Sequence, residues 1–119
     1  MEGLSVSEVA QKCGVSPHAV RYYDDVGLIP GLARESAGRR VFDAESLAWL
    51  EFVVCLRAVG MPIASIRSYV LAASSGRGVE ATRLMRGHLD ELRRRREQLE
   101  HYIALIERKL EVDARRTSQ

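Results

Sequence analysis

The first 42 residues constrain the fold most, because signals for two short helices and a basic hairpin follow one another within them. Ser5, with Glu8 three residues later, is the pattern of a capping box. It predicts a helix that begins at Val6 and ends at Gly14, a residue type that often terminates helices. The apolar side chains of this helix recur at helical spacing, so they predict one buried stripe formed by Val6, Val9, Ala10 and Cys13.

A second helix is predicted directly after the first. Ser16 can cap it, and Pro17 suits its first position, where no backbone N–H is needed. The helix should run to about Val26, with Gly27 ending it. Val20 and Tyr23 would then face inward, and the outer face would carry His18, Arg21, Tyr22 and Asp25. Two short helices joined by a tight turn are typical of a helix-turn-helix.

The next segment, residues 28–42, has the composition of a wing. Pro30, Gly31 and Gly38 disfavour helix, and residues 36–38 can turn a hairpin. A wing beside a recognition helix commonly contacts phosphates, and the planar arginine fork suits that contact. The arginines that this segment offers are Arg34, Arg39 and Arg40.

These two parts together predict an interface for double-stranded DNA. His18 and Arg21 would read base edges or contact phosphates, and Tyr22 would face the DNA backbone. The full set of expected DNA-binding residues is Ser16, His18, Arg21, Tyr22, Arg34, Arg39 and Arg40. An enzyme is not expected, because the chain has no glycine-rich phosphate loop and no evident nucleophile–base pair.

Particular residues resemble the MerR family of bacterial transcription regulators. Those that carry the resemblance are Arg21-Tyr-Tyr-Asp24, Gly27-Leu28, Pro30, Arg34 and Gly38-Arg-Arg-Val-Phe42, followed by Leu56-Arg57, Gly60-Met-Pro-Ile63 and Ile66. The chain departs from the family pattern at four positions. Asp24 stands where Glu is usual, Ala37 and Arg39 where Asn and Tyr are usual, and Phe42 where Tyr is usual.

The resemblance implies a mostly α-helical protein: a winged helix-turn-helix head joined to a long coiled-coil dimerisation helix. It implies a homodimer whose long helices pair antiparallel on a palindromic promoter operator. By the same resemblance, the dimer bends and untwists a promoter with an overlong spacer so that RNA polymerase can engage it. Such deformation is a form of indirect readout.

Composition adds little to the prediction of DNA binding, but it indicates the cellular environment of the protein. The formal net charge is +2, and residues 1–74 hold seven Lys and Arg against eight Asp and Glu. The argument therefore rests on where the arginines lie rather than on net charge. Two cysteines at unpaired-looking positions favour a reducing, cytoplasmic setting. We expect no signal peptide, no membrane segment and no cofactor.

Two helices are predicted between the wing and the only linker-like segment. Asp43 can cap a helix from Ala44, whose strongly apolar course up to Gly60 predicts burial on more than one side. A further helix is expected at about residues 63–73, with Ile63, Ile66 and Val70 facing inward. We therefore expect a DNA-binding domain with connecting helices over residues 1–74 and a linker at 75–78.

Residues 79–113 predict one long dimerisation helix, followed by a flexible tail at 114–119. Apolar residues alternate at four- and three-residue spacing, interrupted once by Arg96, which is the pattern of a coiled coil. Because one helix cannot bury this stripe alone, a second copy of the chain is the simplest partner. The run Arg93–Arg96 is interpreted as a solvated face paired with neighbouring glutamates. The dimerisation residues are Leu89, Leu92, Leu99, Ile103, Ile106 and Leu110.

Cys55 carries two interpretations. Its surroundings resemble the NmlR-like branch of the family, which responds to aldehydes and thiol stress, and this implies a sensor thiol. The alternative is a small buried apolar side chain, as free cysteine commonly is. Cys13 is expected on the buried stripe. A metal site is not expected, because His88 and His101 lie 13 residues apart on the long helix.

Two other classes stay open at this stage. One is an architectural DNA-binding protein of the excisionase kind, which shares the head but acts without polymerase; the long helix argues against it. The other is a ligand-binding or multidrug sensor, whose ligand would have to be very small or act covalently. A regulator with no ligand, such as a ligand-independent repressor, also stays open. Few residues follow the coiled coil, so we expect no separate effector domain.

Overall fold

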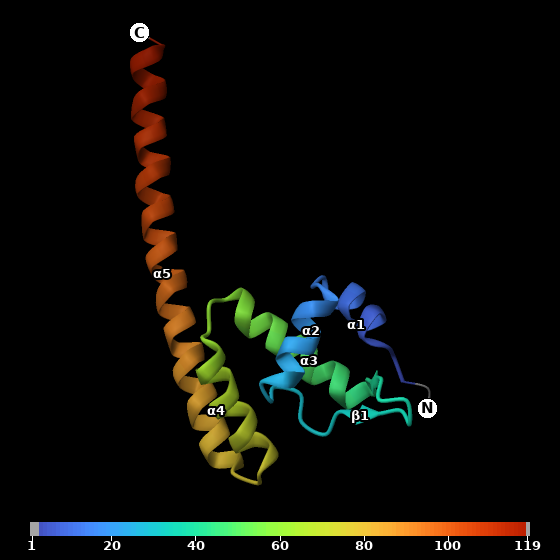
Figure 1. Ribbon diagram of the computed structural model, residues 1–119. Coiled ribbons are helices and arrows are strands. Elements are labelled where there is room, and N and C mark those ends of the chain that lie inside the picture. Colours follow the sequence, from blue (N-terminus) through green and yellow to red (C-terminus); the bar gives the residue numbers. More distant parts are fainter. Residues whose placement is uncertain (1–2, 119) are drawn as a thin grey trace. The chain divides into compact units, whose positions relative to one another are not determined.

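The computed structural model describes residues 3–118. It contains five helices and one two-stranded hairpin within those residues (Figure 1). Their bounds are α1 (Val6–Cys13), α2 (Pro17–Asp25), β1 (Ala33–Arg34), β2 (Arg40–Val41), α3 (Ala44–Ala58), α4 (Ile63–Ser74) and α5 (Gly78–Thr117). The chain divides into two compact units, the first ending at Thr82 and the second beginning at Arg83.

The predicted helix starts are confirmed by their hydrogen bonds. The Glu8 backbone N–H donates to the Ser5 hydroxyl at 3.2 Å, and the Ser5 N–H donates to the Glu8 carboxylate at 3.0 Å. These bonds hold the pKa of Glu8 below its ordinary value, because they favour the ionised form. Asp43 caps α3 by accepting from the Ser46 N–H at 2.8 Å, which lowers the pKa of Asp43 in the same way.

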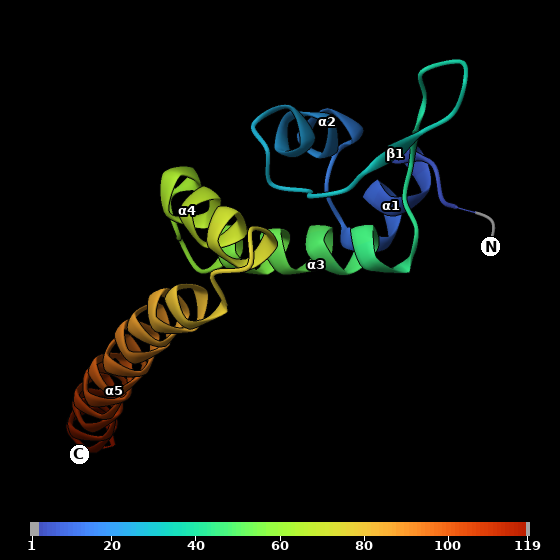
Figure 2. The same cartoon turned by 90° about the horizontal axis from the view of Figure 1, so that it is seen from below.

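The core of the first unit joins all of its helices to the wing. Helix α1 packs against α2 and α3, and α3 packs against α4; Figure 2 shows α3 below α1 and α2. Apolar residues from each element and from the loops between them are buried, and burial of this kind is the main stabilising contribution. The largest of these fully buried side chains are Phe42, Leu28, Leu50, Ile66, Val9, Val20, Val53 and Val70.

The buried residues of α3 follow one helical stripe and the residues beside it are half-buried, so the predicted burial on more than one side is wrong in its extent. Leu50 and Val53 are fully buried, while Trp49 and Phe52 contact the Tyr69 ring of α4 at centroid distances of 6.2 and 5.7 Å. Aromatic pairs at these distances add to the stabilisation from burial. This helix therefore forms the platform on which the helix-turn-helix rests.

The largest differences from the predicted boundaries lie around α5. The linker is one residue shorter than predicted because α5 begins at Gly78, and Ala81, 5% exposed, belongs to the first unit. At the other end α5 continues to Thr117, so residues 114–117 are helical and not a flexible tail. The ion pair from Lys109 to Asp113, at 2.8 Å, supports this last part of the helix.

Within the described residues, no helix combines the length and the apolar character needed to cross a bilayer.

Candidate DNA interface

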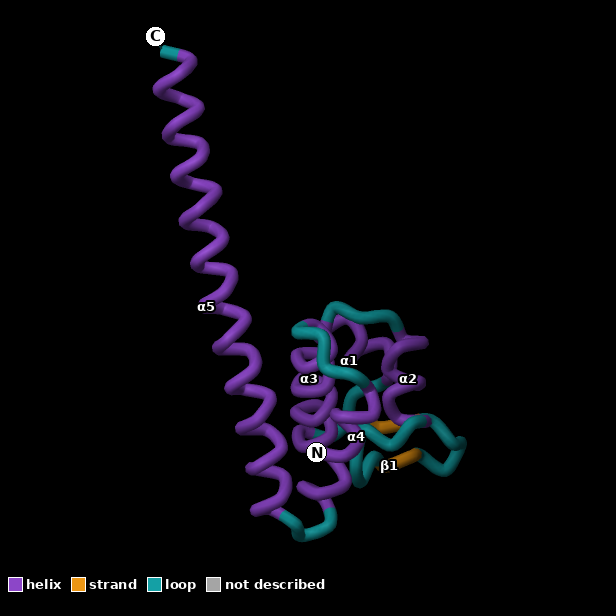
Figure 3. The backbone as a smooth tube through the Cα atoms, turned by 90° about the vertical axis from the view of Figure 1, so that its left-hand side faces the viewer, coloured by secondary structure: helices purple, strands orange, loops and turns teal. Residues whose placement is uncertain are grey.

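The wing is a short antiparallel hairpin closed by a glycine. Ala33 pairs with Val41 and Arg34 with Arg40, and Figure 3 shows these strands in orange. At the tip, the Glu35 N–H donates to the Arg39 carbonyl and the Gly38 N–H donates to the Glu35 carbonyl, both at 2.8 Å. Gly38 has φ 87°, a left-handed conformation that side chains disfavour. The predicted turn at residues 36–38 is confirmed, in the form of a turn followed by a glycine bulge.

The base of the wing is hydrogen-bonded to Leu4, near the N-terminal end of the described residues. Leu4 and Phe42 exchange two backbone hydrogen bonds of 2.8 Å, and the Phe42 ring is fully buried. The family's usual tyrosine hydroxyl is absent here, and the ring that replaces it belongs to the core. A phosphate contact is therefore not expected from the side chain of residue 42.

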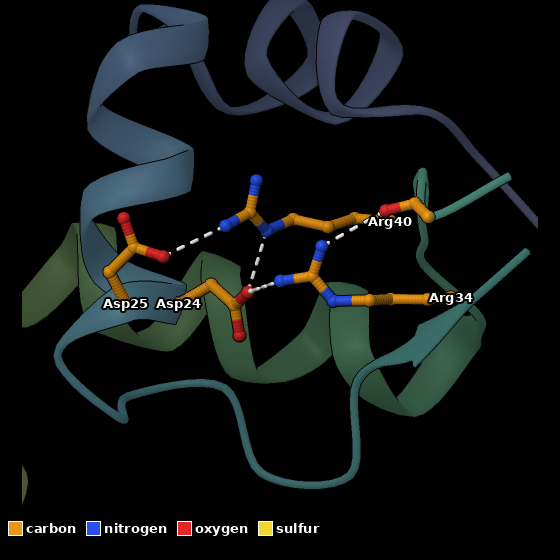
Figure 4. A network of polar contacts seen from close by, with 5 residues as sticks. Asp24, Asp25, Arg34 and Arg40 are labelled. Carbon is orange, nitrogen blue, oxygen red and sulfur yellow. Dashed lines mark hydrogen bonds and ion pairs between the residues drawn. The ribbon is translucent and has the colours of Figure 1, made fainter.

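Two wing arginines bind carboxylates at the end of α2 (Figure 4). Arg40 donates through Nε to Asp24 Oδ2 at 2.6 Å and through Nη2 to Asp25 Oδ1 at 2.8 Å. Arg34 donates to the Gly38 carbonyl at 3.0 Å and lies 3.5 Å from the same Asp24 oxygen. The side chains of Arg40 and Asp24 are 14% and 17% exposed. This network fixes the wing against the recognition helix, since partly buried charge-assisted bonds are stronger than exposed ones.

The network changes the interpretation of Arg40 and adds two residues to the site. We expected Arg40 to contact phosphate, but the structure places its guanidinium on two carboxylates. Asp24 and Asp25 were not among the expected site residues. Their sequence carried a usable signal, because two carboxylates in the last turn of a helix are disfavoured by the helix dipole and are stabilised by a nearby cation.

The other expected residues lie on the outer surface of α2 and the wing. Ser16 caps α2, its hydroxyl accepting from the Ala19 N–H at 3.0 Å, which leaves it at the edge of the surface. His18, Arg21 and Arg39 are exposed, and so is Tyr22. Tyr23, predicted to face inward, is half-buried. Exposed arginine, histidine and tyrosine on a second helix form the surface that such units present to a DNA groove.

A groove of about 470 Å³ brings this surface together with the start of α1. Arg21 reaches it from α2 and Arg39 from the wing, so the structure joins two residues 18 positions apart in the chain. Ser5, which the sequence indicated only as a helix cap, also lines it, and so does Ser7, for which the sequence gave no signal. The remaining lining residues are Val6, Glu35, Gly38 and Arg40. A concave surface with several guanidinium groups can take the edge of a phosphate backbone.

The two cysteines differ from their simplest expectations. Cys55 is exposed on α3, so the alternative of a small buried side chain is wrong for this residue. Cys13 is half-buried rather than buried, and burial together with the charge of Glu51 raises the pKa of its thiol. Within residues 3–118, no group of three or more His, Cys, Asp or Glu side chains is placed to hold a metal ion.

These features define a winged helix-turn-helix, a class of DNA-binding protein: the helix pair α1 and α2, the exposed face of α2 that carries Arg21, and the wing that Arg40 holds to α2. The chain belongs to the MerR family: residues 4–73 match the MerR HTH family regulatory protein, and residues 47–115 match the family described as MerR, DNA binding. Its relatives are transcriptional regulators and not enzymes.

Several known proteins are similar to it. The HTH-type transcriptional regulator AdhR of Bacillus subtilis is 37% identical over 79 residues, which is 66% of this chain and 56% of AdhR. The chain thus spans little more than half of that relative. The crystal structure of a MerR family transcriptional regulator from Listeria monocytogenes is similar, with a TM-score of 0.84 and 28% sequence identity. The match covers 90% of this chain and 83% of the Listeria chain.

A second solved structure is that of HiNmlR, a MerR family regulator lacking the sensor domain, bound to promoter DNA. It has a TM-score of 0.78 at 28% identity, with the same coverage of both chains. The protein is therefore a MerR-family DNA-binding transcriptional regulator.

Proposed function

We propose that the protein binds a palindromic promoter operator as a homodimer and controls transcription by distorting the DNA. The observation that carries this proposal is the joint placement of Arg21 and Arg39 around one groove, on a wing held to α2 by Arg40. The promoter complex of the similar HiNmlR supports the choice of promoter DNA as ligand. By family analogy, RNA polymerase engages the promoter once the DNA has been bent and untwisted.

Dimerisation is part of this proposal. The second unit, from Arg83 onward, is a single helix with exposed apolar side chains along one stripe. Such a stripe is stable in water when a second helix covers it. The residues expected to form the contact are Leu89, Leu92, Leu99, Ile103, Ile106 and Leu110, of which Leu92 is half-buried and the others are exposed.

The test is operator binding and bending by the full chain. Fluorescence anisotropy with duplexes from the promoter nearest its own gene should give a site occupied by two chains, and a permuted-fragment bending assay should report a bend. Arg21→Ala should weaken that binding by about tenfold or more, since a good contact contributes about 1–3 kcal/mol. Equal affinity of wild type and variant for every duplex would remove Arg21 from the interface.

A second candidate function is thiol sensing through Cys55, which its exposure on α3 favours. An exposed thiol is open to an electrophile or oxidant, as a sensor requires. In vitro transcription with reduced and with formaldehyde- or oxidant-treated protein tests it. Activation that appears only after treatment and is lost in Cys55→Ala would support a thiol sensor. Identical transcripts in all samples would leave a regulator that needs no ligand.

A further inference from the structure

We propose that four charged residues beside the apolar stripe of α5 fix how two copies of this helix pair. Each residue follows a stripe position directly, and the four recur at seven-residue spacing. The first two are basic and the last two acidic; they are Arg86, Arg93, Glu100 and Glu107. Given the antiparallel pairing that the family resemblance implies, we infer that they select one register, with the two-fold axis between Glu97 and Gln98. This inference rests on the proposed homodimer.

The position of the four residues makes them one flank of the interface. In a heptad, the residue directly after the second apolar position lies at the edge of the contact and can pair with the facing helix. All four side chains are exposed, so they are available to a second chain. Their order divides the flank into a basic N-terminal half and an acidic C-terminal half.

This order favours antiparallel pairing. A two-fold axis perpendicular to the helices brings the same flank of both copies together, and each contact occurs twice. The basic half of one flank then faces the acidic half of the other. In an in-register parallel pair, by contrast, Arg96 in the stripe would lie opposite Arg96 of the partner subunit, which is a like-charge contact.

The charges also select one register. With the two-fold axis between Glu97 and Gln98, Arg93 and the partner's Glu100 are offset by two residues along the helix direction. At a rise of about 1.5 Å per residue this offset is about 3 Å. Arg86 lies equally close to the partner's Glu107. A slip of one heptad in one direction would place Arg93 opposite the partner's Arg93. A slip in the other direction would place Glu100 opposite the partner's Glu100.

Two independent features agree with this register. The axis falls at the midpoint of the 40-residue helix, so the two copies of Gly78–Thr117 overlap along their full length. The same register matches apolar with apolar residues in the stripe: Met85 with the partner's Leu110, Leu89 with the partner's Ile106, and Leu92 with the partner's Ile103. Arg96 lies opposite the partner's Leu99 in this register and opposite an apolar residue of the partner after either slip, so it does not distinguish the registers. One of the slips also places Asp113 opposite the partner's Leu89.

Arg96 is compatible with the arrangement although it interrupts the stripe. Its Nε lies 3.9 Å from Glu100 Oε1, and both side chains are 68% exposed. The guanidinium therefore reaches out of the stripe toward the charged flank, while its aliphatic stem can cover the partner's Leu99. Glu100 would then interact both with Arg96 of its own helix and with the partner's Arg93.

The first experiment reverses the charges and measures the dimer dissociation constant by sedimentation equilibrium at low salt. Arg86→Glu with Arg93→Glu should weaken the dimer at least about tenfold, because four attractive contacts become repulsive. Adding Glu100→Arg and Glu107→Arg to that variant should restore the wild-type constant, since the flanks are complementary again. The matched control, Arg94→Glu with Arg108→Glu, makes the same change of net charge on the outer face and should have little effect.

The second experiment reads the register directly. A spin label at Arg108→Cys, with Cys13→Ser and Cys55→Ser, should give two labels about 32 Å apart along the axis. A one-heptad slip changes this separation by about 10 Å, and a parallel pair places the labels level. A wild-type dimer with another separation, or one in which the four-residue swap does not restore affinity, would overturn the inference while leaving the homodimer intact. A wild-type monomer at the concentrations tested would instead overturn the proposed homodimer.

Discussion

The first unit and the long helix α5 differ in how exposed their large apolar side chains are. In the first unit, Val9, Phe42 and Leu50 are fully buried within a single chain. On α5, Ile103 and Leu110 are 54% and 62% exposed. The first unit can therefore complete its core by folding, whereas the stripe of the helix is completed by association. Stability of the first unit should be independent of protein concentration, and burial of the stripe should depend on it.

The largest expected effect is the loss of association in Ile103→Asp. This change places a carboxylate in the stripe, and covering an unpaired charge costs about 3 kcal/mol or more, which is about a 100-fold rise in the dimer dissociation constant. Sedimentation equilibrium measures it. The control is Ala104→Asp, which adds the same charge on the outer face of the helix. Dimers of equal affinity in both variants would contradict the assigned stripe.

Leu50→Ala should have the converse effect. It removes a fully buried side chain from α3 and should lower the free energy of unfolding of the first unit by about 3 kcal/mol. The fluorescence of Trp49, the single tryptophan, reports this unfolding in urea. Association through α5 should persist in the variant. Leu71→Ala, at a residue 48% exposed, is the control and should have a much smaller effect. A shift that varied with protein concentration would show that the two regions are not energetically separate.

The wing allows a sharper comparison between neighbouring arginines. Arg40→Ala should destabilise the first unit by about 1–2 kcal/mol, because it leaves the partly buried Asp24 without its 2.6 Å partner. Arg39→Ala should leave stability unchanged but weaken operator binding about tenfold. Urea unfolding and fluorescence anisotropy on both variants measure the two effects. Loss of stability in Arg39→Ala, or none in Arg40→Ala, would reverse the roles assigned to them.

The cysteines should differ in reactivity. Cys55 is exposed, whereas Cys13 is half-buried and burial raises its pKa, so less of the reactive thiolate is present at neutral pH. A chromogenic disulfide reagent should modify Cys55 several-fold faster than Cys13. Cys55→Ala and Cys13→Ala identify each phase. A faster reaction at Cys13 would show that the α1 stripe opens readily in solution.

The smallest expected effect is acid sensitivity of the helix caps. The pKa of Asp43 is lowered by its hydrogen bond to the Ser46 N–H, so the stabilisation is present above the ordinary value of 3.8 and is lost as pH falls through the lower folded value. Urea unfolding followed between about pH 5 and pH 2 should lose part of this dependence in Asp43→Asn, which keeps a capping acceptor but cannot ionise. An unchanged dependence would assign the acid sensitivity to other carboxylates.

Local signals predicted most of the elements. Ser5, Ser16 and Asp43 each cap the helix expected from them, and the glycine turn of the wing lies where it was expected. These features depend on residues within a few positions of one another, so the sequence contains them directly. The C-terminal end of α5 was misplaced because no glycine, proline or cap marks it, and the helix continues to Thr117.

Features of the site that depend on residues far apart in the chain could not be predicted from the sequence. The exposure of Cys55 and the partners of Arg40 depend on which faces of α3, α2 and the wing meet, and spacing along the chain does not specify that. The four wing and helix charges were visible in the sequence, but their pairing across 10 to 16 positions was not.

The sequence by itself determined the helix-turn-helix, the wing and the heptad helix of this MerR-family regulator, because capping, turn formation and apolar periodicity act between residues close together in the chain. The tertiary structure decided that Arg40 holds the wing to α2 while Arg21 and Arg39 stay exposed around one groove. The physical reason is that a guanidinium binds whichever anion the folded chain places beside it, and here folding brings Asp24 and Asp25 to Arg40.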